Sequence, residues 1–264
     1  MKLLKFTIIM CIKDGEKYIN EQIESIINQD FKNWELIIID DCSVDNSLQI
    51  AHKYRELDNR ILVKRNPRKL GVINNFLINS SNQNGEWIVF CDQDDIWKFN
   101  KLSCLNFYIE NNPEFNLFLH NGSYLVSDKK KIYLGAFGEV VINNKKVYEH
   151  IPNLRFINLL FRNQAIGCFI CIKREFFQKF ITLIPKANIY HDHWIVLISS
   201  IYSKIFFINQ DLISYRRHEK TNTKTNKFLN KISDRFLIVF SLLLNHFNLI
   251  KGKDLKVLKE DFNK

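Results

Sequence analysis

The chain has 264 residues, 46% of them hydrophobic, with 38 Lys and Arg against 28 Asp and Glu. This composition excludes a disordered chain and suits one large domain, or one domain with an appendage. The positive charge is uneven, because residues 216–264 contain 12 Lys and Arg against 5 Asp and Glu. A basic segment beside a nearly balanced body predicts contact with an anionic surface.

In the first hundred residues, apolar runs that predict buried strands alternate with segments of helical periodicity. Strands are expected at 5–12, 34–40, 60–65 and 86–91, and helices at 16–29, 47–57 and 71–81. This alternation predicts an α/β fold with a Rossmann-like, mostly parallel sheet and helices on both faces. Polar clusters follow the first, second and fourth strands, with the sequences KDG, DDCSVD and DQDD. Because ligands of such sheets bind at the carboxyl ends of the strands, the clusters predict a binding site there.

Beyond residue 100 the pattern is less regular. Helices are expected at 101–110, 154–161 and 191–203, and strands at 115–120, 131–135, 167–173, 204–209 and 212–218. The apolar run at 236–250 is shorter than the roughly 20 residues that cross a bilayer. Two interpretations of this run stay open: a C-terminal helix packed on the domain, or an interfacial helix on an anionic membrane.

The clearest chemical signal is a trio of carboxylates, Asp92, Asp94 and Asp95. Ionised carboxylates this close repel one another and raise each other's pKa, unless a cation or backbone donors offset the repulsion. Asp92 and Asp94 stand two apart after a strand, so both can face one Mg²⁺ or Mn²⁺ that also binds substrate phosphate. The competing interpretation is a helix N-terminus, which fits Asp95 as the residue that opens a helix through Trp97.

Three further positions carry both a functional and a structural interpretation. Asp41 can accept the imide N–H of a pyrimidine base, or it is a turn or capping residue. Asp192 can act as a general base, or it caps the helix that follows it. The sequence YRRH at 215–218 can bind phosphate or complete a metal site, or it leads into the basic tail. One isolated Cys-x-x-Cys pair does not predict zinc, and all six cysteines are expected to be reduced.

Together these stretches resemble the family-2 glycosyltransferases with the nucleotide-sugar-binding A-type fold, and most of all the bacterial group often labelled rhamnosyltransferase-like. The matching stretches are FTIIMCIKDGEKYINEQIESIINQDFKNWELIIIDDCSVDNS, KLGVINNF, DQDDIW, NQAIGCF, HDHW and YRRH. The resemblance implies a catalytic domain at 1–220, with a nucleotide-sugar-binding half at 1–100 and an acceptor-side half at 101–220. Residues 221–264 are then a basic helical tail.

The resemblance also implies roles for individual residues. Asp192 would be the catalytic base, and Asp94 would bind the metal together with His218. The residues expected to bind the nucleotide sugar are Cys11, Lys13, Asp41, Gly71, Asn75 and Asp92. Those expected on the acceptor side are Gly167, Cys168 and Trp194. The family usually has Thr-Tyr-Asn after its first strand, where this chain has Ile12-Lys13-Asp14, so Lys13 is expected to contact phosphate and no aromatic ring to stack on the base.

The implied function is inverting transfer of a hexosyl or deoxyhexosyl group from a UDP- or dTDP-sugar, assisted by Mn²⁺ or Mg²⁺. The acceptor would be a hydroxyl group of a cell-surface glycan or a lipid-linked saccharide, and the enzyme would lie in the bacterial cytoplasm at the inner face of the membrane. Two alternatives stay open: a catalytically inactive glycosyltransferase-like binding subunit and a phosphohydrolase. A dinucleotide oxidoreductase is not expected, because Gly-x-Gly-x-x-Gly is absent from the sequence. No nucleic-acid partner is expected, because the tail does not interleave aromatic and basic residues.

Overall fold

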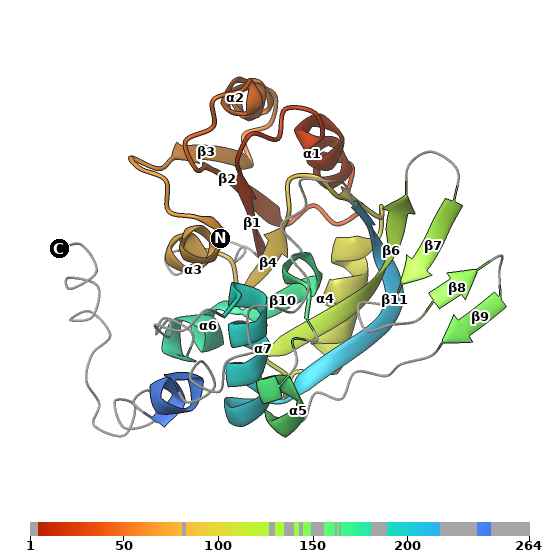
Figure 1. Ribbon diagram of the computed structural model, residues 1–264. Helices are drawn as coiled ribbons and strands as arrows, with labels where there is room; N and C mark the ends of the chain where they lie inside the picture. Colours follow the sequence, from red (N-terminus) through yellow and green to blue (C-terminus); the bar gives the residue numbers. More distant parts are fainter. Residues whose placement is uncertain are drawn as a thin grey trace.

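An 11-stranded β-sheet runs through the structure and joins its two halves (Figure 1). The computed structural model describes residues 5–80, 83–126, 130–134, 140–142, 145–148, 156–161, 163, 165–180, 189–216 and 237–243. The strand order is β3-β2-β1-β4-β10-β6-β7-β8-β9, and β11 pairs with both β6 and β5. The predicted α/β class is confirmed.

The amino-terminal half of the sheet is parallel. Its strands are β1 (Phe6–Ile12), β2 (Trp34–Asp40), β3 (Ile61–Arg65) and β4 (Trp87–Cys91). The helices that connect them are α1 (Ile19–Ile27), α2 (Ser47–Leu57) and α3 (Val72–Ser80). β1 lies between β2 and β4, and β3 is the edge strand beside β2. The strand–helix alternation predicted for this half is therefore confirmed.

The other half of the sheet is mixed, so the parallel arrangement does not extend through it. Its strands are β5 (Ile96–Trp97), β6 (Leu117–Val126), β7 (Lys130–Leu134), β8 (Val140–Ile142), β9 (Lys145–Tyr148), β10 (Ile170–Lys173) and β11 (Ile205–Arg216). β10 is antiparallel to β4 and β6, whereas β11 is parallel to β6. The strands predicted at 204–209 and 212–218 belong, as far as Arg216, to one strand, β11, with register shifts between Ile208 and Ser214, and residues 217 and 218 lie outside the described residues. The segment predicted as a strand at 167–173 begins with a 3₁₀ turn, Gly167–Phe169, before β10.

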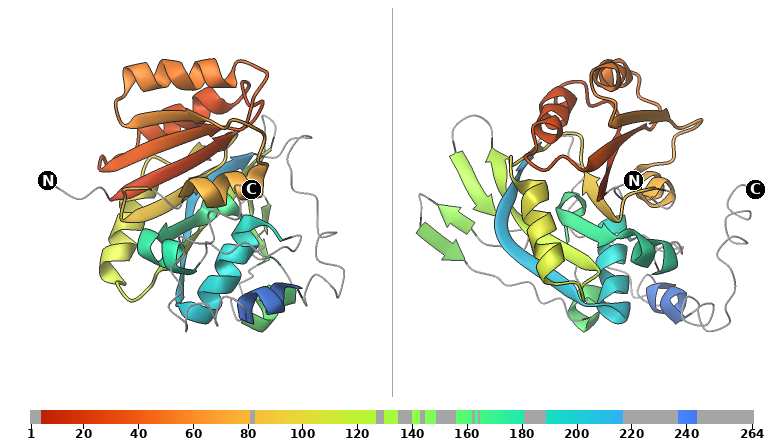
Figure 2. Two further views of the ribbon diagram at one scale, coloured as in Figure 1. Left: turned by 90° about the vertical axis from the view of Figure 1, so that its left-hand side faces the viewer. Right: turned by 180° about the vertical axis from the view of Figure 1, so that it is seen from behind.

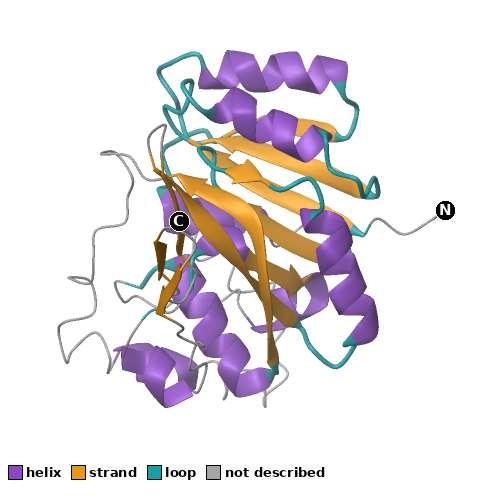
Figure 3. Cartoon of the chain, turned by 90° about the vertical axis from the view of Figure 1, so that its right-hand side faces the viewer, coloured by secondary structure: helices purple, strands orange, loops and turns teal. Residues whose placement is uncertain are grey.

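Helices cover both faces of the sheet (Figures 2 and 3). The remaining ones are α4 (Lys101–Asn111), α5 (Phe156–Phe161), α6 (Arg174–Phe180) and α7 (His191–Tyr202). Because strand side chains alternate between faces, Ile8 and Met10 join one buried apolar cluster and Ile9 joins the other. Full burial of each such side chain stabilises the fold by about 1.5–3 kcal/mol. The first cluster packs under α1 and α4, and the second under α3, α6 and α7.

The helix that Asp95 was predicted to open does not exist, and that prediction was wrong. Ile96 and Trp97 form the short strand β5, which pairs with β11, and α4 begins only at Lys101. Asp95 is fully buried, and its Oδ1 accepts the backbone N–H of Arg216 at 2.9 Å. Pairing with a strand more than a hundred residues away has therefore overridden the local helix signal.

Of the predicted tail, the structure describes residues 237–243, which are helical. Ile238 and Leu242 are buried in the apolar cluster that contains α7. Neither this helix nor any other described helix combines the length and apolar character needed to cross a membrane. The rest of the segment 221–264 lies outside the described residues.

Candidate active site

The carboxyl ends of β1, β2 and β4 lie side by side, because β1 pairs in register with both neighbours. The loops that follow β1 and β4 are joined by the amide of Gln93. Its Oε1 accepts the N–H of Lys13 at 2.8 Å, and its Nε2 donates to the carbonyl of Lys13 at 3.1 Å. The Gln93 amide packs so closely on Gly15 that a Cβ there would stand 2.4 Å from it. The KDG and DQDD clusters thus form one continuous surface, at the edge where the sequence predicted a binding site.

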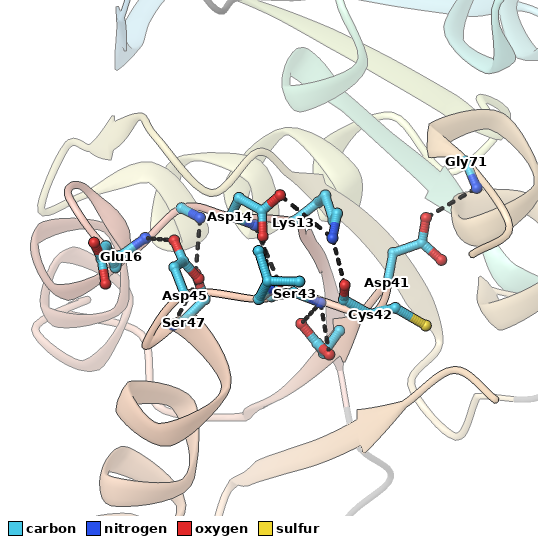
Figure 4. A network of polar contacts seen from close by, with 12 residues as sticks. Lys13, Asp14, Glu16, Asp41, Cys42, Ser43, Asp45, Ser47 and Gly71 are labelled. Carbon is cyan, nitrogen blue, oxygen red and sulfur yellow. Dashed lines mark hydrogen bonds and ion pairs between the residues drawn. The ribbon is translucent and has the colours of Figure 1, made fainter. Parts of the chain in front are cut away.

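The loops after β1 and β2 are tied together by polar contacts (Figure 4). Asp14 Oδ1 accepts the N–H of Val44 at 2.8 Å, and the N–H of Asp14 donates to Ser43 Oγ at 3.1 Å. Asp14 and Cys42 have positive φ angles of 48° and 62°, a region that L-residues seldom occupy. The Lys13 ammonium contacts the Cys42 carbonyl and lies 3.3 Å from Asp14 Oδ2. Its ammonium is therefore already paired at this edge of the sheet, by a carboxylate and a carbonyl of the neighbouring loops.

Asp41 holds the loop that leads into α3. Its Oδ1 accepts the N–H of Leu70 and the Asn66 side-chain amide, both at 2.8 Å, and its Oδ2 accepts the N–H of Gly71 at 2.9 Å. Gly71 has φ 77°, which a glycine adopts without strain. Burial alone would raise the pKa of Asp41, but these hydrogen bonds and Lys69 lower it. Asn66 also donates to Asn75 Oδ1 at 3.0 Å, so the three predicted residues Asp41, Gly71 and Asn75 belong to one network.

The acid cluster, Asp92, Asp94 and Asp95, lies directly after β4. Carboxylate oxygens of Asp92 and Asp95 and the Cys168 thiol lie within 4.8 Å of one another. Burial, followed by the charge of Asp94, raises the pKa of Asp92 to about 7. Burial also raises the pKa of Cys11, and the nearby charges of Asp92 and Asp41 raise it further.

The acid cluster fits a divalent cation. Burial and the charge of Asp94 raise the pKa of Asp92, and a bound cation would offset this repulsion between the two carboxylates. Carboxylates are hard oxygen ligands suited to Mg²⁺ or Mn²⁺. The Cys168 thiol is less suited, because burial raises its pKa and keeps it protonated. Asp94, the predicted ligand, lies near Asp92 but outside the converging trio, and His218 lies outside the described residues.

Asp192 stands at the start of α7, close enough to this cluster to act on the charge of Asp92. Its Oδ1 accepts Asn163 Nδ2 at 3.2 Å and the N–H of His193 at 2.6 Å. Burial raises the pKa of Asp192 to about 6, although these hydrogen bonds oppose the rise. The charge of Asp192 in turn raises the pKa of Asp92. The fold thus brings together two carboxylates that are a hundred positions apart in the sequence.

Of the three residues predicted on the acceptor side, two lie at the site and one lies apart from it. Gly167 packs against α7 so tightly that a Cβ there would lie 2.8 Å from His191 Nε2 and 3.9 Å from the Cβ of Asp192. Cys168 lies beside the acid cluster. Trp194 lies apart from them, because it is fully buried in the second apolar cluster.

Comparison with known proteins agrees with this arrangement. The model of glycosyl transferase family 2 matches residues 7–180. The chain belongs to glycosyl transferase family 2. This family-2 chain is 29% identical to an uncharacterised glycosyltransferase of Haemophilus influenzae over 72% of its own length but only 54% of that protein's. It is 28% identical to glycosyltransferase GlyG of Streptococcus pneumoniae, over 97% of this chain and 84% of the relative. A putative teichuronic acid biosynthesis glycosyltransferase of Bacillus subtilis, TuaG, is 34% identical over 54% of this chain and 64% of its own length.

Solved structures show that the family-2 chain has the A-type fold of these enzymes. The structure of Staphylococcus aureus TarS residues 1–349 in complex with UDP-GlcNAc aligns with TM-score 0.65 and 18% identity, over 90% of this chain and 66% of TarS. A mannosyltransferase of Pyrobaculum calidifontis in complex with GDP-Man and Mn²⁺ aligns with TM-score 0.58 and 14% identity, over 82% of this chain and 58% of that one.

Two polar residues of this family-2 site, Lys101 and His191, were not predicted from the sequence, whereas Arg216 belongs to the predicted YRRH stretch. Lys101 is fully buried, and Arg216 Nε donates to the carbonyl of Asp94 at 2.8 Å. His191 stacks on Phe76 with ring centroids 4.6 Å apart, and within the described residues neither ring nitrogen has a hydrogen-bond partner. His191 could have been found from the sequence, because it stands next to Asp192. Lys101 could not, because nothing in the sequence around a Lys at the start of a helix shows that its side chain is buried.

Proposed function

We propose that this family-2 chain is an inverting glycosyltransferase that uses a UDP- or dTDP-sugar. The proposed transfer moves a hexosyl or deoxyhexosyl group to a hydroxyl of a cell-surface glycan or lipid-linked saccharide, within a catalytic domain at 1–220. The observation that supports it most is the approach of Asp192, with a pKa raised to about 6, to the acid cluster after β4. One base and one site for a charged leaving group are what a single inverting displacement needs.

In this mechanism, Asp192 accepts the proton of the acceptor hydroxyl while the oxygen attacks the anomeric carbon. The bond to the nucleoside diphosphate breaks on the opposite face of the sugar, so the configuration inverts. Lys13 places a positive charge near the departing phosphates, and Asp41 Oδ2 has a lone pair left for the base N–H. A divalent cation, held by Asp92 and Asp94 with His218, would neutralise charge on the leaving diphosphate.

The donor is tested with nucleotide sugars and the purified chain. UDP-GlcNAc, UDP-glucose and dTDP-rhamnose are each added with Mn²⁺, and the unfolding temperature is measured. A bound donor raises the unfolding temperature, because binding to the folded chain adds about 2.7 kcal/mol to its stability at a donor concentration of a hundred times Kd. Chelation of the metal by EDTA is expected to reverse the rise. No shift with any donor would contradict the proposal. A shift without release of the nucleoside diphosphate would favour the inactive binding subunit instead.

The pH dependence of the reaction follows from Asp192. Only its ionised form accepts a proton, and burial raises its pKa to about 6. The expected rate constant kcat therefore falls about ten-fold per pH unit as the pH drops below about 6, and is level above it. A fall that begins only near the ordinary aspartate pKa of about 3.9 would contradict the assignment. The measurement is kcat at saturating donor, with stability checked at each pH.

The proposed location is the membrane surface, reached by the helix at 237–243. This helix buries Ile238 and Leu242 against the second apolar cluster, while Leu237, Phe240 and Leu243 are 43%, 58% and 51% exposed on its other side. The surrounding segment 216–264 has 12 basic residues against 5 acidic ones, a charge complementary to anionic headgroups. A helix with this combination suits the interface of an anionic bilayer.

The membrane proposal is tested by flotation with vesicles. The chain is expected to float with phosphatidylglycerol-containing vesicles and not with pure phosphatidylcholine. Phe240→Glu is expected to lose about ten-fold or more in binding, because a charge replaces an exposed ring that would enter the bilayer interface. Phe107→Glu is the matched control, since Phe107 is 60% exposed on α4 and lies outside this helix. Equal binding to both vesicle types, or equal losses in both variants, would sink the proposal.

A further inference from the structure

Lys101, the first residue of α4, is an unusual charged group, because its side chain is fully buried. Lysines are almost never found in this state unless something pairs with the ammonium. Here the Nζ atom donates to the carbonyl oxygen of Cys168 at 3.0 Å and lies 3.8 Å from the centroid of the Trp97 ring. Both contacts fix the ammonium in place, one through a charge-assisted hydrogen bond and one through a cation–π interaction.

Lys101 also interacts with the acid cluster through its charge. Burial lowers its pKa to about 8, while the negative charge of Asp95 opposes the fall. Conversely, its own charge lowers the pKa of Asp92. Lys101 is therefore a buried cation close to the acid cluster.

The contact with Cys168 connects this cation to the far side of the site. Cys168 lies in the 3₁₀ turn Gly167–Phe169, and its thiol lies within 4.8 Å of carboxylate oxygens of Asp92 and Asp95. The turn is thus held at one residue from two directions, with its carbonyl against Lys101 and its thiol against the acids. The neighbouring Gly167 packs on α7, where its missing Cβ leaves room for His191 and the Cβ of Asp192.

We propose that Lys101 is a positioning residue that fixes the turn Gly167–Phe169 against the acid cluster and thereby sets where Asp192 stands relative to the donor. The inference rests on the proposed glycosyl transfer and adds to it a residue that touches no substrate. Lys101 acts through the Cys168 carbonyl, so its loss displaces the base rather than the donor. A displacement of the order of 1 Å can lower a rate about a hundred-fold.

The test replaces Lys101 with Met, which keeps the length and apolar stem and removes the ammonium. The probe reaction is hydrolysis of UDP-GlcNAc with Mn²⁺, and UDP binding is measured by calorimetry. For Lys101→Met, kcat is expected to fall about ten- to a hundred-fold, while KM and the Kd for UDP stay within about three-fold. The matched control is Leu105→Ala, a fully buried residue one turn further along α4, which lowers stability without changing kcat of the folded enzyme.

A second variant covers the case in which the first does not fold. Lys101→Gln keeps an N–H donor for the Cys168 carbonyl without the charge, and its kcat is expected to lie between those of wild type and Lys101→Met. Wild-type kcat in folded Lys101→Met, or wild-type kcat in Lys101→Gln when the Met variant is unfolded, overturns the positioning role alone. A fall in kcat matched by an equal loss of UDP binding overturns it too. Absence of binding and turnover in the wild type with UDP-GlcNAc, UDP-glucose and dTDP-rhamnose alike overturns the proposed function, and this role with it.

Discussion

Replacement of Asp192 by Asn is expected to lower kcat by about a hundred- to ten-thousand-fold, the range that a general base contributes. Asn has the same shape but cannot accept the proton of an attacking hydroxyl. The hydrogen bonds to Asn163 and the His193 amide involve only Oδ1, so the amide oxygen of Asn can keep both of them. The measurement is the transfer or hydrolysis rate at saturating UDP-sugar and Mn²⁺, together with calorimetry of UDP binding.

The substitution is expected to lower kcat without weakening donor binding. Because Asp192 does not hold the donor in this mechanism, KM for the donor and Kd for UDP should change by less than about three-fold, the pattern of an interaction made only in the transition state. Asp30→Asn is the control, because Asp30 is an exposed carboxylate in the loop before β2, at the opposite end of the strand from the site. Retention of wild-type kcat in Asp192→Asn would assign the base to another residue.

The parts of the fold that were predicted correctly have signals that are local. Both ends of β2 and both ends of α2 follow from short patterns, an apolar run closed by Asp40 and a polar segment with helical periodicity. The binding edge also followed, because parallel strands place their carboxyl ends together and polar clusters came after three of them. Such information is present within a dozen residues, so no long-range contact is needed to find it.

The parts that failed depend on partners far away in the chain. The local sequence around Asp95 predicted the start of a helix. In the structure the residues that follow it form β5, because Trp97 pairs with Ile213 and Ile96 with Ser214 of β11. Lys101 looked like an ordinary first helical residue, and only the fold brings the Cys168 carbonyl to its ammonium. The assignment of Asp41 to the nucleotide base stays a prediction, and what the sequence did not specify is that Asp41 also holds the backbone of Leu70 and Gly71. The local sequence cannot distinguish a carboxylate that binds a ligand from one that accepts hydrogen bonds from the backbone.

The role of Asp94 in metal binding is the prediction that distinguishes two arrangements of the site. Asp94→Ala is expected to weaken Mn²⁺-dependent UDP binding by more than about a hundred-fold, beyond the loss typical of an outer-shell partner. Asp94 is partly exposed, so a cation it binds can keep water and phosphate ligands, as Mg²⁺ and Mn²⁺ require. Asp95 and Cys168 are fully buried and could offer a cation little room for either.

The competing arrangement is the converging trio of Asp92, Asp95 and Cys168. Cys168→Ser probes it without changing a carboxylate, and it is expected to change Mn²⁺-dependent UDP binding by less than about three-fold, because Mn²⁺ prefers oxygen ligands to a protonated thiol. Calorimetry with UDP at several Mn²⁺ concentrations measures both variants, and Asp30→Ala serves as the control. If Cys168→Ser weakens binding while Asp94→Ala does not, the cation lies in the trio. Asp94 would then only add negative charge beside it, and the mechanism would have to place the diphosphate deeper, against Cys168 and the turn that carries it.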